Sequence, residues 1–203
     1  MSSATPIILL DCSRLSELLA PIWGGSAEQR LTLTGTFAGS FCVSACMLLI
    51  WRLVIAPAIP LYKDRIHADR VFLGNSFVSM WPACTAPILA WTSMRSLAWD
   101  DVRVLMTSEA DTYALRAVGI SCGYMMYDTF YCIYYKQMRS PLIIGHHIIP
   151  VLTWPYCALN SRALPIVLFF IITEVRARAA ERARARACSS ASTVLCCRHS
   201  PAL

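Results

Sequence analysis

The sequence predicts an all-α protein, a multi-pass bundle of transmembrane helices with about four complete spans and a partial fifth. The first observation is composition: of 203 residues, 57% are hydrophobic and only 15% are charged, and the mean hydropathy is +0.52. A soluble domain carries roughly 25% charged residues. The second is that apolar runs of roughly 20 residues, the length that crosses a bilayer, alternate with short charged loops.

The charge and cysteine patterns exclude two other classes of protein. The formal net charge is +6, but most of it comes from arginines after Glu174, so the apolar part offers no basic face for nucleic acid. The ten cysteines contain no CxxC pair and mostly sit singly in apolar runs, which predicts neither a disulfide framework nor a zinc site.

Residues 1–30 are expected to form an N-terminal flanking segment, without the basic start of a signal peptide. The membrane domain is expected over residues 31–175. Pro82 and Pro87 should bend its second span, and Ser140 followed by Pro141 is typical of a helix start. The complete spans are expected at residues 33–55, 71–91, 113–135 and 141–159.

A fifth span begins at Ala163 and ends after 11 apolar residues, and residues 176–203 are a low-complexity tail rich in Arg and Ala. Lys and Arg in the first and third loops place those loops on the cytoplasmic side, with the N-terminus on the lumenal or external side.

The third span carries the first candidate site residues. Tyr124, Tyr127, Asp128 and Tyr131 recur at spacings of three and four, which places them on one helix face. An ionisable residue inside a membrane is a functional-site hypothesis, and tyrosines can line a lipid-facing groove while donating hydrogen bonds. The alternative is an aromatic belt, with Asp128 pairing a neighbouring helix.

The fourth span carries His146 and His147, which point about 100° apart on a helix, so only one can face the third span directly. Pro150 leaves the carbonyl of His146 without its helical partner, and Gly145 allows another backbone or an acyl chain to come close. A metal site would more usually place histidines three or four positions apart. The alternative role is structural, because polar contacts commonly hold membrane helices together.

These residues resemble the TLC-domain superfamily, which includes ceramide synthases and translocating-chain-associated membrane proteins. The motif is Gly123-Tyr124…Tyr127-Asp128, a short basic loop, then His146-His147, and the continuation LFFIITEV is similar to the lipid-regulating, non-synthase branch. The resemblance to ceramide synthases implies catalytic roles for His146, His147, Asp128 and Glu174. The tyrosines of the lipid-facing stripe, Tyr124, Tyr127 and Tyr131, are the expected lipid-binding residues.

Two departures from the family pattern bear on function. Ceramide synthases follow the histidine pair with two aspartates, whereas Glu174 is the acid near that place here. Relatives continue the last helix, whereas this sequence passes into the Arg/Ala tail, which we interpret as a truncated or frameshifted C-terminus. The alternative is a genuine basic tail that binds anionic lipid, with Cys196 and Cys197 as palmitoylation sites.

Three functions follow from these patterns. The first is membrane lipid homeostasis, in which a His/Asp/Tyr-lined groove between the third and fourth spans binds or senses lipid. The second is a ceramide-synthase-like N-acyltransferase that uses acyl-CoA as co-substrate, with histidine as general base or acyl carrier. The third is a structural or chaperone-like membrane protein. We expect an endoplasmic reticulum location, membrane lipids as partners, no metal and no cofactor, and leave an oligomeric state open.

Overall fold

The computed structural model describes residues 12–62, 66–97 and 101–173. Several expectations concern residues outside these ranges: the role of Glu174, the nature of the tail at 176–203, and the loop charges Lys63 and Arg65. Within the described ranges the chain is helical and contains no strand, which confirms the all-α prediction.

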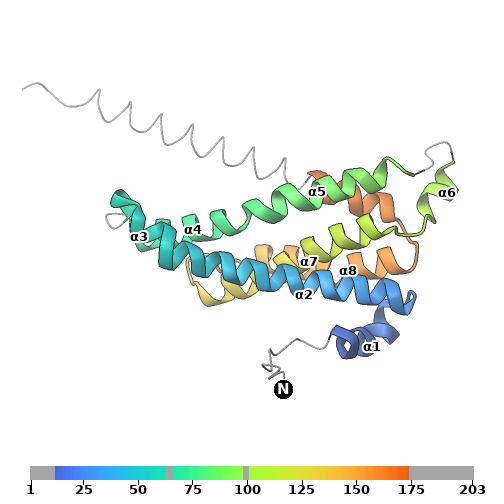
Figure 1. Cartoon of the computed structure of the whole chain (residues 1–203), viewed down its shortest axis with the longest axis horizontal. Coiled ribbons are helices and arrows are strands. Elements are labelled where there is room, and N and C mark those ends of the chain that lie inside the picture. Colours follow the sequence, from blue (N-terminus) through green and yellow to red (C-terminus); the bar gives the residue numbers. More distant parts are fainter. Residues whose placement is uncertain (1–11, 63–65, 98–100, 174–203) are drawn as a thin grey trace, which may run out of the picture.

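The helices form an elongated bundle (Figure 1). In chain order they are α1 Cys12–Trp23, α2 Ala27–Ile50, the π-helix η1 Trp51–Ile55, α3 Ala56–Ala58, the 3-10 helix η2 Pro60–Tyr62, α4 His67–Val78, α5 Met80–Met94, α6 Val102–Met106, α7 Thr112–Tyr134 and α8 Pro141–Leu159. A further apolar helix follows at Leu164–Thr173.

The first span is longer than expected at both ends. Ser26 and Gln29 form a capping box, in which Gln29 N donates to Ser26 Oγ at 3.2 Å and Ser26 N donates to Gln29 Oε1 at 3.0 Å. This reciprocal pair satisfies backbone donors that a helix start leaves unpaired, so the helix begins at Ala27. It then continues through η1 and α3, giving one helical stretch, Ala27–Ala58.

The second span is interrupted at one residue rather than bent smoothly. Ser79 separates α4 from α5 and lies three positions before Pro82. A proline has no N–H, and its ring clashes with the carbonyl of the residue four positions back, which here is Val78. The backbone hydrogen bonding of the helix is therefore weakened between Val78 and Ser79. Pro87 lies inside α5 without ending it.

The third span, α7, is the central helix of the bundle. Asp111 caps its start by accepting from Ala114 N at 2.7 Å. α7 packs against α2, α5 and α8, and its contact with α2 depends on two glycines. A Cβ at Gly119 would lie 2.8 Å from Thr36 Cβ, and one at Gly123 would collide with the Phe37 carbonyl oxygen. Small residues four apart let two membrane helices approach closely.

In the described part of the chain, two helices are long and apolar enough to cross a membrane by length and composition: Ala27–Ala58 and Pro141–Leu159. The expected four complete spans are therefore supported in part. α7 has the length but not the hydropathy of these two helices. Most of its residues are buried against other helices, and the polar residues of a membrane bundle typically face its interior.

Candidate functional site

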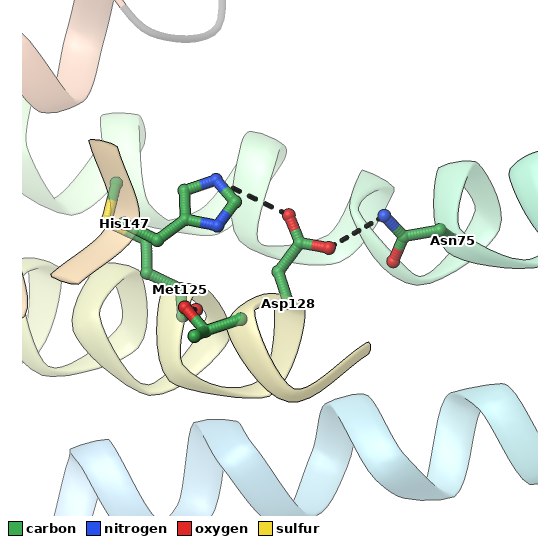
Figure 2. A network of polar contacts seen from close by, with 5 residues as sticks. Asn75, Met125, Asp128 and His147 are labelled. Atoms are coloured by element: carbon green, nitrogen blue, oxygen red, sulfur yellow. Dashed lines mark hydrogen bonds and ion pairs between the residues drawn. The ribbon is translucent and has the colours of Figure 1, made fainter. Parts of the chain in front are cut away.

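A buried carboxylate joins three helices at the centre of the candidate site. Asp128, on α7, is 5% exposed. One of its oxygens, Oδ1, accepts a hydrogen bond from Asn75 Nδ2 of α4 at 2.7 Å. The other, Oδ2, lies 3.5 Å from His147 Nε2 of α8. Figure 2 shows Asp128 between the two partners, and we call Asn75, Asp128 and His147 the polar network.

The two adjacent histidines have different surroundings, as the helical geometry predicts. His147 is 3% exposed and faces Asp128, whereas His146 is exposed. Their ring centroids stand 5.5 Å apart. The structure thus brings together two of the predicted catalytic residues, His147 and Asp128, and leaves His146 outside the network. The catalytic role of each stays a prediction.

The network includes a residue that the sequence-based site lacked. Asn75 is a polar side chain within an apolar run, which is the signal that could have identified it. Its Oδ1 atom is buried and has no hydrogen-bond partner among the described residues, and the same holds for the Tyr127 hydroxyl. A buried polar atom without a partner costs about 1–3 kcal/mol, so both atoms are candidates to bind a ligand.

The tyrosines predicted to share one face of the third span do lie together, but they pack against the protein interior. Tyr124, Tyr127 and Tyr131 are buried in one cluster with Val71 and Val78 of α4. The Tyr131 hydroxyl donates to the Val71 carbonyl oxygen at 2.8 Å. These contacts connect α7 to the second span rather than to lipid.

At the level of the network the third and fourth spans are in direct contact, because Asp128 and His147 meet there and are buried. The groove expected between these two spans stays a prediction. A pocket of about 300 Å³ lies between the first, second and third spans, one helical turn from the network. We call it the basic pocket, and its lining residues are Leu48, Trp51, Arg52, Tyr62, His67, Arg70, Val71, Gly74, Tyr131 and Tyr135.

The polar network can support two kinds of chemistry. A carboxylate beside an imidazole can orient the ring and stabilise its protonated form, as in general-base catalysis. The same contact can simply hold helices together. Among the described residues no group of three or more His, Cys, Asp or Glu side chains is placed to hold a metal ion.

The comparisons with known proteins place these residues in a family. A family model described as TLC domain matches residues 73–177, just over half of the chain and all three residues of the network. No curated protein and no solved structure matches the chain. With the two apolar helices, the match indicates a membrane protein of a lipid-related family. The predicted superfamily is therefore confirmed, and the chain belongs to the TLC-domain family.

Proposed function

We propose that this protein acts in membrane lipid homeostasis, at the endoplasmic reticulum, by binding lipid at the polar network. The observation that carries the proposal is the placement of Asp128, which is buried inside the bundle and held by side chains from two other helices. Intramembrane ionisable groups are costly and mark functional sites by default. The TLC-domain match supplies the lipid-related class of function.

The unsatisfied atoms of the site favour binding over a purely structural role. A network that served only to join helices would gain most from having every polar atom paired. Here Asn75 Oδ1 and the Tyr127 hydroxyl have no hydrogen-bond partner among the described residues. A lipid headgroup or backbone with hydroxyl or amide groups can satisfy both atoms.

The outer face of α8, which points away from His147, provides an apolar surface. Leu142, Ile149 and Leu152 are exposed on this helix, and a Cβ built on Gly145 would meet no atom within 4 Å. Acyl chains can lie along such a surface because they are as apolar as the side chains.

The test is the lipid profile of a host membrane that expresses the protein. We expect the wild type to change the profile, and His147→Ala and Asp128→Asn to abolish the change. Thr153→Ala is the matched control, since this exposed α8 hydroxyl donates to its own helix at Ile149. If all variants act like the wild type at equal expression, the polar network is structural and lipid binding there is wrong.

The contact between His147 and Asp128 favours one second candidate, an N-acyltransferase. In that reaction the imidazole takes a proton from a long-chain amine, the amine attacks the thioester of an acyl-CoA, and an amide and free CoA result. Asp128 would stabilise the imidazolium. Labelled acyl-CoA with a sphingoid base tests it: amide product that depends on His147 supports catalysis, and no product leaves the binding function.

A further inference from the structure

We propose that the basic pocket binds a phosphate group, carried either by a lipid headgroup or by a soluble phosphate ester. The inference rests on the proposed function for the lipid source only, because none of the network residues lines the pocket. Its three basic residues also lie outside the stretch matched by the TLC-domain model.

The described residues that line the pocket include basic side chains and no acidic one. Arg52, His67 and Arg70 line it, and none of the ten described lining residues carries a carboxylate. The acid of the first turn of α4, Asp69, is not among the lining residues. Arginine is the side chain best suited to phosphate, because its planar donors match two phosphate oxygens.

Two buried donors of the pocket have no acceptor. Trp51 is 8% exposed, and its Nε1 atom is buried without a hydrogen-bond partner among the described residues. The Nε atom of Arg70 is also buried and has no hydrogen-bond partner among the described residues. An indole N–H and a guanidinium can only donate. The missing partner is therefore an acceptor, and phosphate oxygens are acceptors.

The backbone around the pocket favours an anion as well. Trp51 and Arg52 begin the π-helix η1, a local distortion that is frequent at functional sites. The start of α4, beside His67, has no side-chain cap on Ile66, so its first amide groups are not satisfied by a capping side chain. The N-terminus of a helix attracts negative charge.

Aromatic rings hold these groups in place. The Arg52 guanidinium carbon lies 5.6 Å from the ring centroid of Tyr135, and the Trp51 ring stacks on Phe77 at 5.2 Å. The volume of about 300 Å³ is at the small end for ligand sites. It therefore suits a headgroup rather than a whole lipid.

The experiment measures binding by calorimetry to the full chain in neutral detergent, with three probes: short-chain phosphatidic acid, diacylglycerol and glycerol phosphate. We expect phosphatidic acid to bind and Arg70→Gln to weaken it by about tenfold or more, from the loss of a charged hydrogen bond. Lys136→Gln removes an exposed charge after α7 and should change affinity less than about twofold. Trp51→Phe keeps a ring, removes one donor and should weaken binding by roughly two- to tenfold.

The outcomes separate the two proposals. If glycerol phosphate binds as tightly as phosphatidic acid, the pocket binds phosphate and its ligand is a soluble phosphate ester. This result supports the phosphate pocket and gives no support to lipid binding at the polar network. Equal binding of diacylglycerol and phosphatidic acid, lost in His147→Ala, supports lipid binding and overturns the phosphate pocket. The pocket proposal is also overturned if neither phosphate probe binds, or if Arg70→Gln and Trp51→Phe both match Lys136→Gln.

Discussion

Two tyrosines one turn apart on α7 differ in what their hydroxyls contact. Tyr131 donates to the Val71 carbonyl oxygen at 2.8 Å, whereas the buried Tyr127 hydroxyl has no partner among the described residues. We expect Tyr131→Phe to lower the free energy of unfolding by about 1 kcal/mol and Tyr127→Phe to leave it unchanged or raise it. Thermal unfolding in detergent measures both. A larger loss in Tyr127→Phe would show that its hydroxyl is paired within the protein.

The adjacent histidines give a second matched pair. His147→Ala removes a partner from the buried Asp128 carboxylate, and we expect it to lower the free energy of unfolding by about 1–3 kcal/mol. His146 is exposed, and His146→Ala should change it by less than about 0.5 kcal/mol. Denaturant titration of both variants checks this order. Equal losses would contradict the assignment of His147 alone to the polar network.

At the residue scale, the sequence was enough to select Asp128 and His147 of the polar network, but not Asn75. Asp128 and one of two histidines were predictable because ionisable residues are rare in apolar runs. Asn75 has the weaker signal of an uncharged polar residue, and only the fold brings α4 beside Asp128. The tyrosine spacing gave the correct face, but spacing does not say whether a face meets lipid or another helix.

At the element scale, the contact between α2 and α7 depends on Gly123. A Cβ there would collide with the Phe37 carbonyl oxygen and lie 2.8 Å from Ser40 Cβ, so the helices must separate. We expect Gly123→Ala to lower the free energy of unfolding by about 1–3 kcal/mol. The control is Gly39→Ala on α2, where a Cβ would meet nothing within 4 Å.

The control should be neutral or stabilising, because alanine favours a helix over glycine by about 1 kcal/mol. Thermal unfolding of both variants gives the comparison, and a milder effect at Gly123 than at Gly39 would refute the close packing.

The sequence indicated small residues in the first span, but not which of them meet α7. Similarly, Pro82 predicted a bend in the second span, while the break appears at Ser79 because proline acts on the turn before it.

At the scale of the whole molecule, α7 should cross the bilayer even though its hydropathy is modest. Its 23 residues extend about 34 Å, enough for a hydrocarbon core of about 30 Å. We expect an N-glycosylation acceptor inserted at residues 107–110 to be modified and one inserted at residues 136–139 to remain unmodified. Gel mobility before and after glycosidase measures this. Modification at both places would contradict a spanning α7.

The arrangement of the helices in the bundle was harder to predict from the sequence than the helices themselves. Apolar runs predicted the helices and the TLC-domain resemblance predicted the family, and both are confirmed. The basic pocket combines residues from α2, η1, η2, α4 and α7. No local pattern reports such an arrangement, because it depends on which helices become neighbours. The groove predicted between the third and fourth spans depends on the same arrangement and stays a prediction.

The central claim is that the polar network binds lipid, and retained lipid tests it most directly. The full chain is extracted in mild detergent, and co-purified lipid is measured by mass spectrometry for the wild type, Asp128→Asn and the Thr153→Ala control. We expect the wild type and the control to retain the same lipid, and Asp128→Asn, although folded, to lose most of it. Equal retention by a folded Asp128→Asn would contradict lipid binding at the polar network.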